Sequence, residues 1–346
     1  MLIVLSFVAI AVMRVVQKIC SKRVSNSVKS GELFFRYGAF YQFVAALFSL
    51  ITLAIVGFYG FNLPTVLCAL ASALLFAVDL YAGIEVLKGC SMTIATMFSL
   101  GGLIISCVLS IFMFDEPMSV FQAVGLALFF VGAYLLTPSK SKEKKKISLK
   151  TYILLFISFL VNGFVMIVQK YFSQKVMGGN VAMFSFLTFV LNALILLSCA
   201  VVLTVKRKNK EKAEAAVTIE NAENEALENE VAISEDLEKC AAVAEQKKEK
   251  KSPVFFGLTK THLICGTLLA FAVFVINLLV TELGKTVPSV ILFPISSAIS
   301  IGLSVIVGWV VYKEKLTVRN FVGLFVGLLG IVVIGVLTPA TVAKWF

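Results

Sequence analysis

Charged residues are scarce in this chain. Only 15% of its 346 residues are Asp, Glu, Lys or Arg, whereas 59% are hydrophobic and the mean hydropathy is +0.97. A soluble domain carries about 25% charged and about 45–50% apolar residues, so the composition favours a protein surrounded by lipid. The net charge of +11 does not indicate a nucleic-acid partner. The basic residues lie mostly in loops beside apolar runs, where they suit contact with anionic headgroups.

Catalytic and metal-binding residues are also few. The chain has one histidine, His262, no P-loop sequence and no acidic cluster within an apolar run. A membrane-embedded transferase would need clustered acids, histidines or metal ligands, and an ATP-driven pump would need a phosphate-binding loop. The seven cysteines (20, 68, 90, 107, 199, 240 and 265) show no C-x-x-C spacing, which is typical of small apolar packing residues. We therefore expect no enzymatic activity, cofactor or metal site.

The sequence does contain a series of long apolar runs. About 20 mostly apolar residues cross a hydrocarbon core of about 30 Å, and such runs occur ten times. They are Leu2–Gln17, Leu33–Phe58, Pro64–Leu87, Met92–Phe114, Met118–Leu136, Tyr152–Phe172, Val181–Val205, Leu263–Leu283, Val287–Tyr312 and Leu316–Leu337. The runs are about twice as long as barrel strands and show no period-two alternation. The sequence therefore predicts an all-α membrane protein with ten transmembrane helices.

The first run is the weakest of the ten, because it is short and contains Arg14. A cleaved signal peptide is the alternative interpretation of this segment. However, no basic segment precedes its apolar core and no A-x-A site follows it, so we expect a transmembrane helix.

Three short matches recur between the two halves of the chain. They join residues 15–24 to 167–176, residues 85–88 to 282–285, and residues 116–132 to 314–330. Their offsets are 152, 197 and 198 residues, so the offset grows once, by 198 − 152 = 46. A charged segment from about Lys206 to Lys251 has the length that this jump requires. The sequence therefore predicts a duplication with one insertion.

Each predicted half holds five spans, an odd number, so the two copies must cross the membrane in opposite senses. Inverted repeats of this kind are found in many transporters, with the substrate site near the membrane midplane between the halves. We expect a first repeat at 1–138, a basic linker at 139–150, and a second repeat at 151–338 interrupted by a charged insertion at 206–260. The Glu, Lys and Ala of the insertion are typical of a disordered or partly helical solvated loop.

The segment between the fourth and fifth spans has a pattern that recurs in the second half. It consists of an acidic residue, a small hydroxyl, a polar residue and two glycines seven apart. These are Glu116, Ser119, Gln122, Gly125 and Gly132, and then Glu314, Thr317, Asn320, Gly323 and Gly330. With the paired halves, this pattern resembles the EamA-type ten-helix members of the drug/metabolite transporter superfamily.

The resemblance implies a secondary transporter in the cell membrane. Such a protein moves a small metabolite or amphipathic compound by alternating access, with a proton or sodium ion as coupling ion, and is a monomer or homodimer. Small multidrug relatives exchange protons on a Glu in the first helix, but the first and sixth runs here contain no carboxylate. A channel, a non-transporting receptor and a membrane-embedded transferase are the alternative functions.

Ionisable side chains within the apolar runs are the first candidates for function. One such group costs about 2.5–3.5 kcal/mol on insertion scales. Asp79 lies fifteen residues into the third run, near Tyr81, and is our candidate for substrate recognition or coupling, with an interhelical salt bridge as the alternative. Arg14 would pair with Asp79 if the first and third helices touch, recognise an anionic substrate, or snorkel to the headgroups.

Amides and a proline are the second group of candidates. Asn277 lies 198 residues after Asp79 and is therefore its approximate counterpart. Amides within the runs could line a polar cavity or join helices by hydrogen bonds; they are Asn162, Asn192, Asn277, Gln17 and Gln169. Pro294, followed by Ser296, interrupts the ninth run, and Ser99 lies in the counterpart region of the fourth. Breaks at corresponding positions indicate a cavity or gate, or else a packing kink.

Three further features have structural interpretations. Glu85 with Lys88, and Glu282 with Lys285, have the i,i+3 spacing of ion pairs near the interface. The glycines of the last run, at 323, 327 and 330, have the small-xxx-small spacing that lets helices approach closely.

Basic residues near helix ends favour the cytoplasm. With the insertion set aside, the odd loops hold fourteen of them and the even loops and tails hold four. The fourteen are Lys18, Lys22, Arg23, Lys29, Lys88, Lys140, Lys142, Lys144, Lys145, Lys146, Lys150, Lys313, Lys315 and Arg319, and the four are Lys170, Lys175, Lys285 and Lys344. This bias places both termini outside, whereas the family resemblance implies termini inside.

Overall fold

Every regular element in the computed structural model of this protein is an α-helix, within the residues that the structure describes. These are residues 2–25, 31–89, 92–115, 118–135, 148–228, 257–289, 291–296, 303 and 318–336. The helices are α1 (Leu2–Ser25), α2 (Gly31–Val56), α3 (Leu63–Gly89), α4 (Met92–Phe114), α5 (Val120–Leu135), α6 (Leu149–Lys175), α7 (Val181–Glu228), α9 (Lys260–Leu283) and α11 (Val318–Val336).

Most predicted spans coincide with these helices to within a few residues, and α4 has the predicted bounds. Two helices are longer than predicted: α1 continues to Ser25, and α7 continues through the first part of the insertion to Glu228. The insertion is therefore helical over residues 206–228, and residues 229–256 lie outside the described part. Of the ninth predicted span, only residues 287–289, 291–296 and 303 are described.

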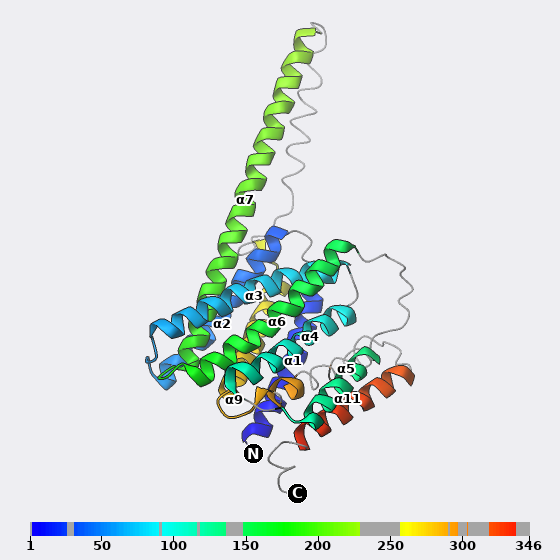
Figure 1. Ribbon diagram of the computed structural model, residues 1–346. Coiled ribbons are helices and arrows are strands. Elements are labelled where there is room, and N and C mark those ends of the chain that lie inside the picture. Colours follow the sequence, from blue (N-terminus) through cyan, green and yellow to red (C-terminus); the bar gives the residue numbers. More distant parts are fainter. Residues whose placement is uncertain are drawn as a thin grey trace, which may run out of the picture.

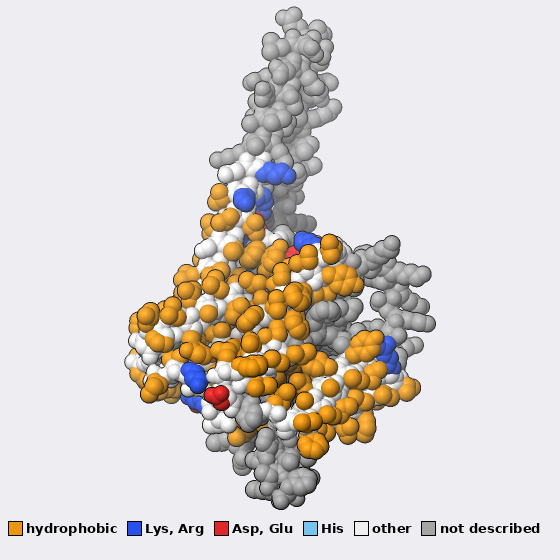
Figure 2. Space-filling model, in the orientation of Figure 1, with side chains coloured by type: hydrophobic (Ala, Val, Ile, Leu, Met, Phe, Trp, Pro, Cys, Tyr) orange, Lys and Arg blue, Asp and Glu red, His pale blue; other side chains and the backbone are white. Residues whose placement is uncertain are grey.

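Six of the described helices are long and apolar enough to cross a membrane, namely α1, α2, α3, α6, α7 and α9. Large apolar side chains remain on their outer faces; Ile55, for example, is 80% exposed. On the face that Figure 2 shows, hydrophobic side chains cover most of the described body, and Lys and Arg lie at its edges, several of them where α7 leaves the body. Proteins in water rarely expose so large an apolar surface. The protein is therefore membrane-embedded.

Local capping explains where several helices begin. At α5, the Ser119 hydroxyl accepts from the Gln122 backbone N–H at 3.1 Å, and the Gln122 side chain accepts from the Ser119 N–H at 3.0 Å. At α9, Thr259 and His262 form the same reciprocal arrangement. Such capping boxes satisfy backbone donors that the first helical turn leaves free. Ser119 and Gln122 of the repeated pattern thus cap the N-terminus of α5, and His262 takes part in the N-terminal cap of α9.

The helices pack in distinct pairs. The most extensive contacts join α2 to α7 and α5 to α11, and further large contacts join α3 to α6, α4 to α6, α1 to α9, α3 to α7 and α2 to α9. Figure 1 shows α5 and α11 lying together at one edge of the body, and α7 projecting from the body as a long rod. The start of α1 lies at the end of the body opposite that projection (Figure 1).

Glycines bring two helix pairs into backbone contact. At the α5–α11 crossing, a Cβ added to Gly132 would lie 2.6 Å from the Gly327 Cα, and one added to Gly330 would lie 2.6 Å from the Gly125 carbonyl oxygen. At the α4–α6 crossing, a Cβ on Gly102 would lie 2.7 Å from the backbone nitrogen of Gly163. The predicted close approach of the last helix is therefore present, and its partner is α5.

Ion pairs and hydrogen bonds join the ends of helices that are far apart in the chain. Arg207 at the exit of α7 pairs with Glu32 at the start of α2, at 2.6 Å. Three other contacts at helix ends also cross between elements: Lys150 of α6 with Glu85 of α3 at 3.6 Å, Arg319 of α11 with the carbonyl of Tyr134 on α5 at 3.4 Å, and Asn180 before α7 with the carbonyl of Gly57 after α2 at 3.1 Å. These contacts fix which helix ends lie together at each end of the body.

Candidate functional site

Asp79 lies inside the helix assembly, between α3 and α6. Its Oδ1 accepts hydrogen bonds from the Asn162 side-chain nitrogen at 2.9 Å and from the Ser158 hydroxyl at 3.1 Å. Ser158 and Asn162 are one turn apart on α6, so both side chains reach the same carboxylate. This geometry brings together two of the residues predicted from the sequence, Asp79 and Asn162, and adds Ser158.

Charged and phenolic groups from two further helices act on this carboxylate. Arg14 of α1 interacts electrostatically with Asp79 and also donates a hydrogen bond to the Gln17 side-chain oxygen at 3.3 Å. Tyr41 of α2 lies close enough to Asp79 to interact electrostatically, and its hydroxyl accepts from Gln42 at 3.1 Å. The hydrogen bonds of Asp79 thus join α3 to α6, and Arg14 of α1 and Tyr41 of α2 lie within electrostatic range of its carboxylate.

A second polar chain crosses the interior through Asn277. The Gln169 side-chain nitrogen of α6 donates to the Asn277 oxygen at 2.5 Å, and the Asn277 nitrogen donates to the Ser185 hydroxyl of α7 at 2.9 Å. Asn277 is 2% exposed and Ser185 is fully buried. Interhelical hydrogen bonds of this kind hold membrane helices together. The predicted counterpart of Asp79 is therefore also a point where three helices meet.

Several buried polar atoms have no hydrogen-bond partner among the described residues. Both amide atoms of Asn192 on α7 are in this position, although the residue is fully buried. Four other buried atoms also lack a partner there: the side-chain oxygen of Gln42 on α2 and the hydroxyls of Tyr37, Ser49 and Ser72. Buried polar groups are nearly always paired, so an unpaired set on neighbouring helices is suited to a polar solute.

The register of α2 and α7 places the buried amides of Gln42 and Asn192 at similar depth. The two helices run antiparallel, because Glu32 contacts Arg207 near one end while Leu53 packs on Ala182 near the other. Gln42 lies 11 residues before Leu53, and Asn192 lies 10 residues after Ala182. The α2–α7 crossing therefore carries two buried amides near its centre.

Lys170 is a buried cation, although its position at the end of an apolar run predicted a loop residue. Its side chain is 1% exposed, and its ammonium donates to the carbonyl of Val287 at 2.7 Å. Val287 immediately precedes Pro288, so its carbonyl lies at the start of the ninth predicted span. Lys170 therefore joins the end of α6 to that segment.

Other predicted site residues lie elsewhere. Tyr81 is 41% exposed and stacks on Phe35 with ring centroids 6.1 Å apart, so the structure does not bring it to Asp79. Pro294 is buried in the short helical segment 291–296, and the Ser296 hydroxyl donates to the Leu292 carbonyl at 2.7 Å. The side chains of Ser99 and Lys88 lie outside the described part.

Of the two predicted interfacial ion pairs, Glu282–Lys285 is present in the structure, whereas Glu85 has another partner. Glu282 and Lys285 contact each other at 2.8 Å on the exposed surface. Glu85 reaches Lys150 of α6 at 3.6 Å, a contact between helices that lie far apart in the chain. The sequence could not indicate Lys150, because its position near Glu85 depends on the packing of α3 against α6.

The arrangement can bind a small polar group and hold one proton or cation. The carboxylate of Asp79 accepts, Arg14 supplies a counter-charge, and neutral amides and hydroxyls offer both donors and acceptors. Ser158, Tyr41 and Gln42 were absent from the sequence candidates because they are neutral and common in membrane helices. Only the packing of α2, α3 and α6 brings them near the partly buried carboxylate of Asp79.

The comparisons with known proteins support the fold but give no function. No family model matches this chain, and no curated protein matches it. Among solved structures, 28 chains match. One of them, described only as "Crystal structure of protein", aligns with a TM-score of 0.66 and 9% identity over 97% of this chain and 98% of its own. Another protein thus shares this helical arrangement over its whole length.

Proposed function

We propose that this protein is a secondary transporter of the drug/metabolite type, which moves a small metabolite or amphipathic compound across the cell membrane by alternating access. The observation that carries the proposal is the partly buried carboxylate of Asp79, which is hydrogen-bonded between α3 and α6 with Arg14 of α1 and Tyr41 of α2 within electrostatic range. An ionisable group inside a membrane protein is costly and most often serves transport or coupling. Asp79 is the proposed recognition or coupling residue.

The helix pairing supports two repeats of five spans. If spans one to five correspond to spans six to ten, then α2 corresponds to α7 and α5 to α11, and these are the two most extensive contacts. In the same scheme α3 corresponds to α9 and α1 to α6. The α3–α6 contact is then equivalent to the α9–α1 contact, and the α2–α9 contact to the α7–α3 contact. All four contacts are present. Two-fold related copies would produce this pattern of contacts.

The contacts at helix ends support a chain that crosses the membrane at every span. In a ten-span chain, Glu32 and Arg207 belong to the first and seventh loops, and Glu85 and Lys150 to the third and fifth. Gly57 and Asn180 belong to the second and sixth loops. Each contact joins loops of the same parity, as it must if odd and even loops lie on opposite sides of a bilayer.

In this mechanism the polar network is reached from one side of the membrane at a time. Two halves joined at α2–α7 and α5–α11 would rock about these pairs, so that solvent enters between α3 and α6 or between α1 and α9. The amide of Asn192 and the side-chain oxygen of Gln42, which lack partners among the described residues, would bind polar groups of the substrate, and Asp79 would exchange a proton or sodium ion. The charge bias of the loops leads us to propose that both termini lie outside.

Accessibility of the network tests the proposal without knowledge of the substrate. A single cysteine replaces Asn162 in a chain whose native cysteines are changed to Ala or Ser, and a membrane-impermeant methanethiosulfonate is applied to vesicles of known orientation. We expect slow labelling from both sides, because alternating access exposes the site to each in turn. Cysteine at exposed Lys285 is the control, labelled from one side only.

Two results of this experiment would contradict the proposal. No labelling of the Asn162→Cys protein from either side would mean that the network is a closed structural core. Labelling from both sides accompanied by an ionic conductance in planar bilayers would mean a channel. A fluorescent reporter at the C-terminus tests orientation separately, and fluorescence of a type that matures only in the cytoplasm would refute termini outside.

A further inference from the structure

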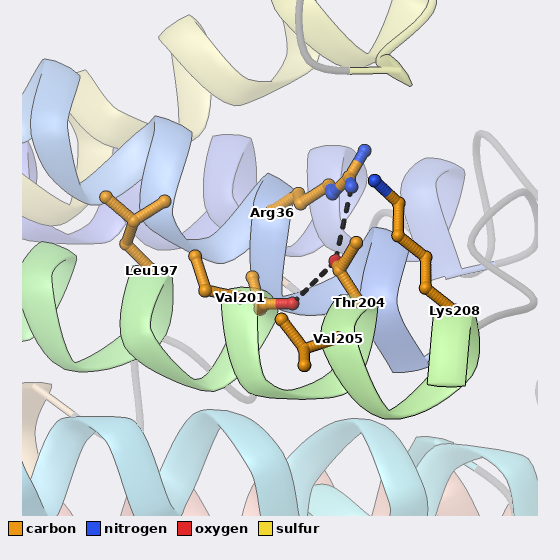
Figure 3. A pocket seen from close by; sticks show the side chains of 7 residues that line it. Arg36, Leu197, Val201, Thr204, Val205 and Lys208 are labelled. Atoms are coloured by element: carbon orange, nitrogen blue, oxygen red, sulfur yellow. Dashed lines mark hydrogen bonds between the residues drawn. The ribbon is translucent and has the colours of Figure 1, made fainter. Parts of the chain in front are cut away.

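A groove lies on the membrane-facing surface between α2 and α7, close to the point where α7 leaves the apolar body (Figure 3). Its volume is about 460 Å³, within the range of about 300–1,000 Å³ that is typical of small-molecule sites. It is lined by Arg36, Leu197, Ala200, Val201, Thr204, Val205 and Lys208. None of these residues belongs to the Asp79 network, so the groove is a separate feature.

The wall of the groove is an apolar stripe on α7. Leu197, Val201 and Val205 follow at intervals of four residues and therefore share one face of the helix. They are 38%, 54% and 50% exposed, and they belong to a segment that is apolar enough to cross the membrane. The stripe extends about 12 Å along the helix axis. Side chains that remain open at this depth contact lipid chains.

The rim of the groove is basic. The apolar stretch of α7 ends at Val205 and is followed by Lys206, Arg207 and Lys208, which places this level at the headgroups. Figure 3 shows the charged ends of Arg36 and Lys208 at the same end of the groove, turned toward each other.

One carboxylate neutralises part of this charge. Glu32 pairs with Arg36 at 2.5 Å and with Arg207 at 2.6 Å, and it accepts from the Thr204 hydroxyl at 2.9 Å. Arg36 and Arg207 thus share a single acid, and Lys208 also lines the groove, so the net charge of the rim stays positive. Like charges that converge on one place are stabilised by an anion between them.

We propose that this groove binds an anionic phospholipid. Its phosphate would lie between Arg36 and Lys208, and one acyl chain would follow the stripe of Leu197, Val201 and Val205 into the membrane. Basic pockets between membrane helices bind anionic lipid headgroups in this way. A zwitterionic lipid fits less well, because its own cation would add to the positive rim. Since Arg36 is on α2 and Lys208 on α7, the bound lipid joins these two helices.

The test uses the full-length chain, purified in detergent and freed of lipid. Native mass spectrometry measures the binding of phosphatidylglycerol and of phosphatidylcholine with the same acyl chains. We expect preferential binding of phosphatidylglycerol, and a Lys208→Ala change should weaken it roughly fivefold, the effect of one basic residue near an anionic lipid. Lys210→Ala is the matched control, because Lys210 is exposed on the same helix but does not line the groove.

A second variant tests the apolar wall. Val201→Trp fills the groove and should reduce the retention of phosphatidylglycerol while leaving all charges in place. Lipid should also raise the apparent melting temperature of the wild-type protein more than that of Lys208→Ala, because it joins α2 to α7. Both variants change exposed side chains, and size-exclusion chromatography verifies that they fold.

Three results would overturn the proposal. The first is equal binding of the two lipids, and the second is an equal effect of Lys208→Ala and Lys210→Ala. The third is phosphatidylglycerol binding only after deletion of residues 229–250, which would mean that the acidic part of the insertion occupies the groove. All three outcomes are independent of whether the protein transports a solute.

Discussion

The glycines at the α5–α11 crossing allow a prediction in which neighbouring positions behave differently. An alanine Cβ at position 132 would lie 2.6 Å from the Gly327 Cα and 2.7 Å from the Gly323 carbonyl oxygen. At position 330 it would lie 2.6 Å from the Gly125 oxygen and 2.7 Å from the Phe129 nitrogen. At position 327, in contrast, the nearest atom is the Gly132 Cα at 3.9 Å, an ordinary van der Waals contact.

Gly132→Ala and Gly330→Ala should therefore destabilise the protein, and Gly327→Ala should not. The clashing atoms are backbone atoms, so the helices must separate by several tenths of an ångström along the crossing. Overpacking of this kind costs about 1–3 kcal/mol. Helix propensity acts in the opposite direction, since Ala is about 1 kcal/mol better than Gly in a helix interior.

The assay is the apparent melting temperature of each variant in detergent, followed by fluorescence and by size-exclusion chromatography. We expect Gly132→Ala and Gly330→Ala to melt several degrees below the wild type. Gly327→Ala should melt at or slightly above it, because it gains helix propensity without a clash. The same melting temperature for all three variants would refute the backbone contact between α5 and α11.

Three more predictions concern the interior and are measured in the same way. Asp79→Asn should lower the apparent melting temperature, since charge-assisted hydrogen bonds are worth about 1.5–3 kcal/mol, whereas Glu282→Gln, in an exposed pair, should have little effect; equal shifts would contradict this. Asn192→Leu should stabilise the protein by about 1–3 kcal/mol, because it removes an unpaired buried amide. Asn277→Leu should destabilise the protein, because it breaks two hydrogen bonds. If both variants were more stable than the wild type, Asn277 would not be paired as described. Lys170→Met should destabilise the protein by about 1–3 kcal/mol because the Val287 carbonyl loses its donor, while Lys175→Met, at an exposed position, should not.

The placement of the helices could be predicted because it depends on a local property. A stretch of apolar residues long enough to cross a bilayer forms a helix there whatever its neighbours are, since no other structure satisfies its backbone in lipid. The bounds of α4 and the start of α7 at Val181 follow from this. The end of α7 at Glu228 does not, because Glu, Lys and Ala suit a solvated helix and a solvated loop alike.

The candidate site was predictable only in part. Asp79, Asn162 and Asn277 could be named from the sequence because a polar group within an apolar run is conspicuous. Lys170 could not, since a lysine at the end of a span is expected to reach the headgroups, and only the position of the Val287 carbonyl makes it a buried residue. Ser158 likewise became a site residue only because α6 packs on α3.

The amino-acid sequence by itself determined that this is a helical membrane protein and where most of its described helices begin and end, because hydrophobic length and composition act along a single helix. The tertiary structure alone decided the partners. It placed α7 against α2 and α11 against α5, gave Glu85 the distant Lys150, and formed the basic groove between Arg36 and Lys208. Such contacts depend on the relative positions of two helices, and neither helix contains that information on its own.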